Sequence, residues 1–205
     1  MTNDTKVPER KLRRRPQRGG ADGFLLGAKL TPTAAITNID RIAWSTKRSS
    51  HQHWPLKAQN TSPLQWWRTL PADEFRDAEQ LLLLATLKRI RVLRGGDDLK
   101  AALGGDTGAA IDVAFTLMPI ETFTLEGDIA MTALARCAIE RNAAAALVLA
   151  QIIGLTDFDH GLGMVLAGSW YAHGRRYSSE PSKFGEAGAV LLAAILERRH
   201  DGGEA

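Results

Sequence analysis

Two histidines and a group of acidic residues are the strongest candidates for metal chemistry in the sequence. His51 and His53 are separated by one residue, which places both imidazoles on the same face of an extended chain. Metal sites use this spacing, and imidazole combined with carboxylate oxygens suits zinc, iron or manganese. Asp157, Asp159 and His160 could complete the ligand set. Because such a site with an open position would activate water, a small helical metal-dependent enzyme is one alternative.

Tryptophans interleaved with basic residues form a second candidate site, which would bind a partner. Indole rings stack on the bases of single-stranded nucleic acid, while nearby cations hold the phosphates. The candidate residues for binding nucleic acid or another partner are Arg13, Arg14, Arg15, Trp44, Lys47, Arg48, Trp54, Trp66 and Trp67. Each tryptophan can bury about 200 Å² of surface. The alternative is therefore that the tryptophans anchor this segment to the rest of the chain or to another copy of it.

Charge divides the chain into two unequal parts. Residues 1–70 carry 13 Lys and Arg and 4 Asp and Glu, a net charge of +9. Residues 71–205 carry 13 basic and 19 acidic residues, a net charge of −6. This asymmetry predicts a basic arm on an acidic body. The arm would attract nucleic acid, anionic lipid or an acidic protein, or fold back onto its own body, because opposite charge alone does not select among these.

Composition divides the chain further into three segments. Residues 1–22 are rich in Lys, Arg, Pro and Gly and poor in apolar side chains, which predicts a disordered basic tail. Residues 23–70 are predicted to be a Trp-rich basic arm. We expect this arm to be largely extended, because Trp54 and Ser62 each precede a proline that disfavours helical geometry. Residues 71–205 are predicted to form a helical domain.

Apolar residues at helical spacing, placed between capping residues, predict the elements of this domain. The first helix is expected over residues 72–94, with acids at its start and bases at its end, as the helix dipole favours. Its apolar face would consist of Phe75, Ala78, Leu82 and Ala85. Asp106 and Asn142 are expected to cap two later helices through their side chains. The remaining helices are expected over residues 97–103, 106–118, 126–141, 143–153, 159–173 and 182–199, with Gly174 ending the sixth.

The predicted fold class is all-α: a compact array of six or seven short Ala-rich helices with a long basic, mostly extended N-terminal arm. Twenty alanines between residues 101 and 194 would let the helix axes approach closely. A single cysteine, Cys137, excludes an internal disulfide and a multi-cysteine zinc site. We expect Cys137 to be a small buried apolar residue and His173 to cap the end of its own helix.

The function expected from these features is that of a non-enzymatic binding or adaptor protein. Its basic Trp-rich arm would contact a partner, and nucleic acid is one candidate. The metal-dependent enzyme stays open as an alternative, as does a structural subunit whose arm wraps a neighbouring chain. No cofactor is expected. A protein partner or self-association is expected. The sequence has no apolar stretch of roughly 18 residues, so no transmembrane helix is expected. No apolar run of the kind found in a secretory signal follows the first arginines, so a cytoplasmic location is expected.

Overall fold

The fold is given by a computed structural model that describes residues 54–91, 96–158 and 160–201, without the side chains of residues 198–201. Every regular element within these ranges is a helix, which confirms the predicted all-α class. The α-helices are α1 (Trp66–Thr69), α2 (Asp77–Arg89), α3 (Asp97–Gly104), α4 (Thr107–Thr116), α5 (Leu125–Ile139), α6 (Ala143–Leu155), α7 (Gly163–Tyr177) and α8 (Phe184–Asp201). Three short 3-10 helices flank α1, namely η3 (Ala58–Asn60), η4 (Pro63–Gln65) and η5 (Ala72–Glu74).

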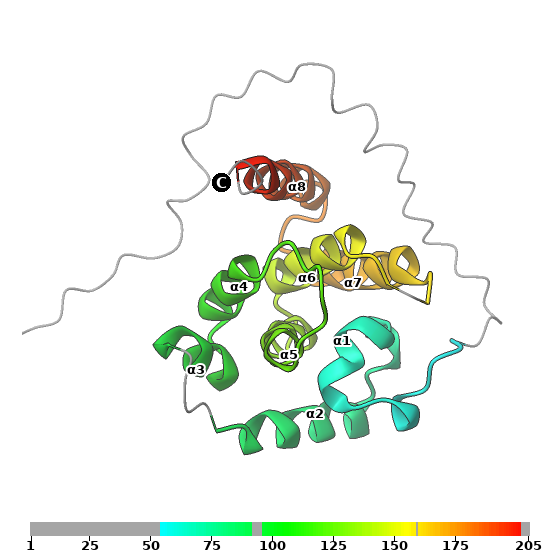
Figure 1. The fold of residues 1–205 in the computed structure, drawn as a ribbon. Helices are drawn as coiled ribbons and strands as arrows, with labels where there is room; N and C mark the ends of the chain where they lie inside the picture. The colour runs from blue at the N-terminus through cyan, green and yellow to red at the C-terminus, as the bar shows by residue number, and fades with distance from the viewer. Residues whose placement is uncertain (1–53, 92–95, 159, 202–205) are drawn as a thin grey trace, which may run out of the picture. The chain divides into compact units, whose positions relative to one another are not determined.

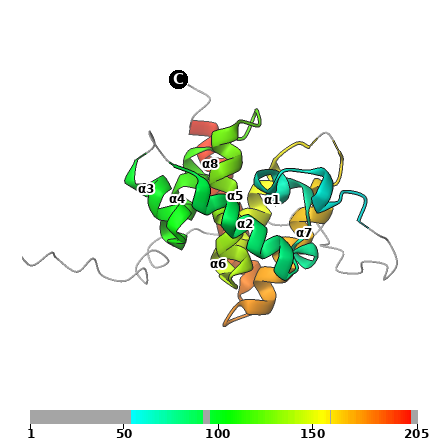
Figure 2. The ribbon, with the colours of Figure 1, turned by 90° about the horizontal axis from the view of Figure 1, so that it is seen from below.

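The helix α5 lies at the centre of the body (Figure 1). α2 packs on one side of α5, α3 and α4 on a second, and α6 on the side away from α2. α7 runs beside α6, and α8 packs on α6 from outside. The view from below shows α2 lying across α5 (Figure 2). Residues 130–135 of α5 and 145–153 of α6 are buried without a break, so these two helices form the interior.

Two predicted helix starts are confirmed in side-chain detail. An oxygen of Asp106 accepts a hydrogen bond from the backbone N–H of Ala109 at 3.0 Å, and α4 begins directly after it. Asn142 accepts from the N–H of Ala145 at 3.0 Å in the same way at the start of α6. Both caps were predictable because the bond spans only three residues and needs no partner from elsewhere in the chain.

The first predicted helix was wrong in its start and in its buried face. The carboxylate of Glu79 accepts a hydrogen bond from the N–H of Arg76 at 3.2 Å, so α2 begins at Asp77, several residues after the expected start. Leu83 and Leu87 are its buried residues, whereas Leu82 is exposed. The consecutive leucines of this helix supply an apolar side chain in every direction, and spacing alone could not identify the side that packs.

The helix predicted over residues 159–173 was displaced along the chain. α7 runs from Gly163 to Tyr177, and Gly174, expected to end the helix, lies buried inside it. A Cβ atom at Gly174 would lie 2.7 Å from Cζ of Phe184 and 2.9 Å from Cβ of Ala146. The glycine therefore permits close helix packing. Asp159, the expected cap, lies outside the described residues.

The described part of the predicted arm, residues 54–70, consists mainly of short helical turns. Pro63 occupies the first position of η4, where its missing N–H costs nothing, and Ser62 caps that turn by accepting from the N–H of Leu64. The predicted extended geometry of residues 23–53 and the predicted disorder of residues 1–22 both fall outside the described residues. None of the described helices combines the length and the apolar character needed to cross a membrane.

Candidate functional site

Residues 54–70, hereafter the tryptophan-rich segment, fold back on themselves and pack into the helical core. Trp66 and Trp67 are only 2% and 1% exposed. The indole N–H of Trp54 donates to the carbonyl of Thr69 at 2.7 Å, and that of Trp66 donates to the carbonyl of Ala58 at 3.2 Å. Packing, the alternative that the sequence left open, thus accounts for these three tryptophans. The buried rings of Trp66 and Trp67 are not available as stacking platforms for bases.

A carboxylate, a guanidinium and an indole join this segment to α5. Nε1 of Trp67 donates to Oδ1 of Asp128 at 2.9 Å. Arg68 donates through Nε to Oδ1 at 3.0 Å and through Nη2 to Oδ2 at 3.1 Å, which makes a bidentate ion pair. Asp128 is buried in the first turn of α5, whose cap is Thr124. Bidentate, charge-assisted bonds at this depth fix the position of the segment on the body.

An aromatic stack lies beside this ion pair. The rings of Phe123 and Phe158 are stacked with centroids 5.6 Å apart, and Phe158 stacks in turn on the imidazole of His160 at 5.2 Å. The guanidinium of Arg68 lies over the Phe123 ring, 4.5 Å from its centroid. Trp67 meets Phe158 edge-on at 6.0 Å. We call these five residues and Asp128 the Asp128 cluster; its six members are Trp67, Arg68, Phe123, Asp128, Phe158 and His160.

Both ring nitrogens of His160 are engaged by the backbone. Nδ1 accepts a hydrogen bond from the N–H of Leu162 at 3.0 Å. Because Nδ1 is an acceptor, the proton of the neutral ring resides on Nε2, which donates to the carbonyl of Arg68 at 2.9 Å. His160 therefore links the chain before α7 to the chain of α1.

The predicted metal site receives no support from the residues that are described. His160 would have to break a backbone hydrogen bond to offer a nitrogen to a metal. Asp157 is exposed, and no group of three potential ligands is close enough to hold a metal ion within the described ranges. His51, His53 and Asp159 lie outside those ranges.

The basic part of the predicted binding site also falls largely outside the described residues. This applies to Arg13, Arg14, Arg15, Lys47 and Arg48, and Trp44 lies outside them as well. Lys57 is exposed on the described segment, whereas Arg68 is committed to Asp128. Contact between the arm and nucleic acid therefore stays a prediction.

Sequence reasoning missed the pair that holds the segment in place. Arg68 is one of the cations interleaved with the tryptophans, and nothing in the sequence singled out Asp128. The two residues are 60 positions apart, so no local spacing relates them. A charged residue directly after two tryptophans was the one available hint, because an arginine next to buried rings needs a carboxylate partner.

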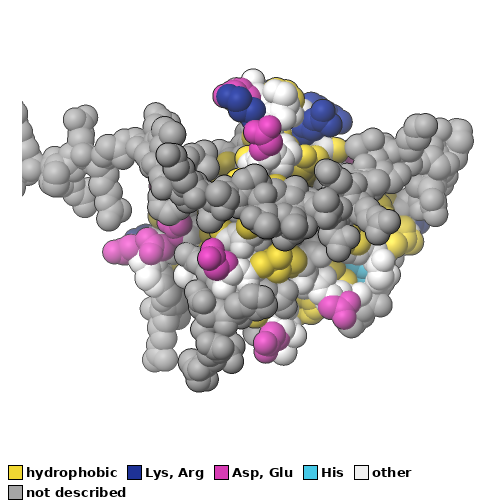
Figure 3. All heavy atoms as spheres, turned by 90° about the horizontal axis from the view of Figure 1, so that it is seen from above, with side chains coloured by type: hydrophobic (Ala, Val, Ile, Leu, Met, Phe, Trp, Pro, Cys, Tyr) yellow, Lys and Arg dark blue, Asp and Glu magenta, His cyan; other side chains and the backbone are white. Residues whose placement is uncertain are grey.

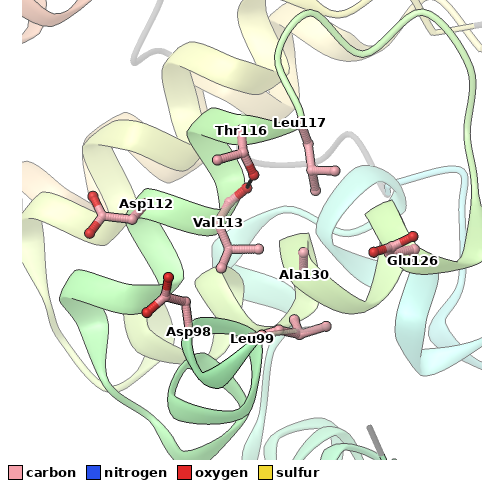
Figure 4. A pocket seen from close by; sticks show the side chains of 9 residues that line it. Asp98, Leu99, Asp112, Val113, Thr116, Leu117, Glu126 and Ala130 are labelled. Atoms are coloured by element: carbon pink, nitrogen blue, oxygen red, sulfur yellow. Dashed lines mark hydrogen bonds between the residues drawn. The ribbon is translucent and has the colours of Figure 1, made fainter. Parts of the chain in front are cut away.

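A shallow cavity of about 240 Å³ opens between α3, α4 and α5. Its apolar wall includes Leu99, Val113 and Leu117. Figure 4 shows the carboxylates of Asp98 and Asp112 on one side of it and that of Glu126 on the other. No basic side chain is among the described residues that line it.

The outward surface of α2 carries several exposed apolar side chains. Leu81 is 67% exposed and Leu82 50% exposed, and Ala78 is exposed beside them. α8 also exposes apolar side chains, Val190 and Leu196. On the face that Figure 3 presents, hydrophobic side chains likewise lie open between acidic ones. Exposed leucines on one helix face are typical of surfaces that pair with another helix.

Two further residues with reactive or titratable side chains, Cys137 and His173, have structural roles. Burial raises the pKa of the Cys137 thiol, which keeps it protonated, and the expectation of a buried apolar residue is confirmed. His173 does not cap its own helix. Its Nε2 donates to the carbonyl of Ala138 at 3.0 Å and so caps the end of α5, and burial lowers the pKa of its imidazole.

Comparison of the chain with protein-family models, with curated proteins and with solved structures finds no match. The described residues therefore define an all-helical body without a family assignment.

Proposed function

We propose that this chain is a non-enzymatic binding protein whose basic N-terminal residues contact nucleic acid, while the helical body anchors them. The carrying observation is the division of charge, +9 over residues 1–70 against −6 over residues 71–205. Phosphates attract a cluster such as Arg13, Arg14 and Arg15 through counterion release, without sequence specificity. An acidic protein surface would offer carboxylates in place of phosphates and is the other class of partner for these residues.

The packing of the tryptophans refines this proposal. Trp54, Trp66 and Trp67 are used within the body, so Trp44 is the one remaining indole of the arm that we assign to the partner. The Asp128 cluster supports an anchoring role, because it fixes the chain that follows the basic residues to α5 by a bidentate ion pair. A partner held by the arm would then be coupled to the body.

The test measures the binding of a labelled single-stranded oligonucleotide by fluorescence anisotropy at several salt concentrations. We expect the wild-type affinity to fall steeply with salt. A triple Arg13→Ser, Arg14→Ser and Arg15→Ser variant should bind more weakly. Its plot of log affinity against log salt should be flatter by about 2, since each single-strand phosphate contact contributes about 0.7 to the slope.

A matched pair of double variants separates the arm from general charge. Lys47→Ser with Arg48→Ser removes two charges from the arm, and Arg175→Ser with Arg176→Ser removes two exposed charges from the end of α7. We expect the first to weaken binding and the second to leave it unchanged within a factor of about two. Equal effects of the two variants, or unchanged binding by the triple variant, would overturn the proposal.

A further inference from the structure

The outward surface of α2 carries apolar side chains opposite the buried face of the helix. Leu83 and Leu87 point into the core, and the opposite side carries Leu81 and Leu82 in solvent. Burying a leucine side chain is favourable relative to leaving it in water, so two adjacent exposed leucines on one helix favour association. We call the residues Ala78, Leu81, Leu82 and Ala85 the outer face of α2.

The spacing within the outer face fits a second helix. Ala78, Leu81, Leu82 and Ala85 stand at positions i, i+3, i+4 and i+7, which places them on one side of the helix. The two leucines lie between two alanines, whose small side chains let a second helix axis approach closely. This is the pattern by which an amphipathic helix docks on another helix.

The charges at the two ends of α2 favour a second copy of the same helix, packed antiparallel, as the partner. Exposed Asp77 stands at the first position of the helix, and exposed Lys88 and Arg89 stand at its end. Asp77 lies five residues before Leu82, and Lys88 lies six residues after it. If a second α2 packed antiparallel across a two-fold axis near the leucines, the carboxylate of each copy would face the bases of the other. A parallel pair would place like charges side by side.

From the leucines, their spacing and this self-complementary charge pattern, we infer that two copies of the chain associate through the outer faces of α2, packed antiparallel. The contact is isologous, because the same surface serves both copies, and it closes at a dimer. In an antiparallel pair the two helix dipoles also point in opposite directions, so the positive end of each helix lies beside the negative end of the other. A pair of 13-residue helices buries less surface than a standard interface, so the dimer is weak, with a dissociation constant in the micromolar range. This inference is independent of the nucleic-acid contact proposed above.

Sedimentation equilibrium of the full chain over a range of concentrations tests the association. We expect a reversible monomer–dimer equilibrium for the wild type. Leu81→Gln with Leu82→Gln should weaken dimerisation at least tenfold without lowering the melting temperature, since both side chains are exposed. The matched control is Val190→Gln with Leu196→Gln on α8, which should leave the equilibrium unchanged.

A charge exchange tests the antiparallel geometry. Asp77→Lys alone and Lys88→Glu alone each bring like charges together across the two-fold axis and should weaken the dimer. The double variant restores opposite charges and should recover most of the lost association. Circular dichroism of each variant verifies that the helices are intact. A purely monomeric wild type at high micromolar concentration, or a dimer unaffected by the leucine variant, would overturn the inference. Absence of rescue by the double variant would overturn the antiparallel arrangement, and neither result depends on binding to an oligonucleotide.

Discussion

Three hydrogen bonds converge on the carboxylate of Asp128, one from the indole of Trp67 and two from the guanidinium of Arg68. The side chain is buried, so water cannot replace these donors if the carboxylate is removed. The residue therefore links the tryptophan-rich segment to the central helix. The contribution of Asp128 to the free energy of unfolding can be measured by substituting this one side chain.

Asp128→Ala should lower the free energy of unfolding by about 2–4 kcal/mol, because it leaves a buried indole N–H and a largely buried guanidinium without an acceptor. Asp128→Asn retains an oxygen that can accept from Trp67 and should cost about half as much. Urea denaturation followed by circular dichroism gives both values. The control is Asp112→Ala, an exposed acid on α4, which should change stability by less than about 0.5 kcal/mol. Equal effects at the two positions would show that the ion pair contributes nothing.

His173 makes the stability of the body depend on pH. Burial lowers the pKa of its imidazole below the ordinary 6.5; the hydrogen bond to the carbonyl of Ala138 opposes this shift, and the nearby charges of Arg176 and Arg141 add to it. The unfolded chain therefore binds the proton more readily than the folded chain does. It follows that the stabilisation is complete above the unfolded pKa and declines as the pH falls below about 6.5.

His173→Gln removes this titration and keeps an N–H that can donate to the carbonyl of Ala138. We expect the wild type to lose more free energy of unfolding between about pH 7.5 and pH 5 than the variant does. Urea denaturation of both proteins at the two pH values measures the difference. An identical loss in the two proteins would contradict the assigned role of His173.

At the scale of elements, α7 packs closely on α6 and on the start of α8 at Gly174. A Cβ atom at Gly174 would lie within 3.0 Å of both Phe184 and Ala146. Gly154 in α6 offers a contrast, because a Cβ atom there would meet Cβ of Ala167 at an ordinary 3.7 Å. Both glycines are inside α-helices, so they differ in packing and not in backbone type.

Gly174→Ala should therefore destabilise the protein by about 1–3 kcal/mol, because crowding between helices outweighs the gain in helix propensity. Gly154→Ala should stabilise it by up to about 1 kcal/mol, since only the propensity changes. Thermal unfolding of the two variants against the wild type measures both signs. A stabilising Gly174→Ala would refute close packing as the reason for this glycine.

Helix α2 shows why the buried side of an element is hard to predict. The expected face included Ala78 and Leu82, which prove to be exposed, whereas Leu83 and Leu87 are buried. Consecutive leucines satisfy several helical faces equally well, and the choice among them depends on where α5 lies. The same exposed leucines carry the proposed association between copies.

At the scale of the whole molecule, the folded body begins well before residue 71, the boundary expected from the composition. Trp66, Trp67 and Leu70 belong to the same apolar core as α5 and α6. Each tryptophan buries on the order of 200 Å². Removing them would cost a large part of the roughly 5–15 kcal/mol by which a domain of this size is stable.

A chain that begins at Pro71 should therefore lose the cooperative unfolding transition of the full chain. Denaturant titration monitored by circular dichroism measures this. Trp54→Phe in the full chain is the mild counterpart, since it removes one hydrogen bond to Thr69 and should cost about 1 kcal/mol. A sharp two-state transition in the shortened chain would show that the segment before residue 71 is dispensable for folding.

The sequence by itself determined the helical class and the helix starts that depend on local bonds. Asp106 and Asn142 cap their helices through contacts three residues away, and no distant residue is needed for that. Tertiary structure alone decided that Arg68 and Asp128 pair, that Gly174 lies between helices and that Leu82 faces solvent. These outcomes depend on which elements lie side by side. Local spacing does not determine this arrangement, because it results from the packing of the whole core.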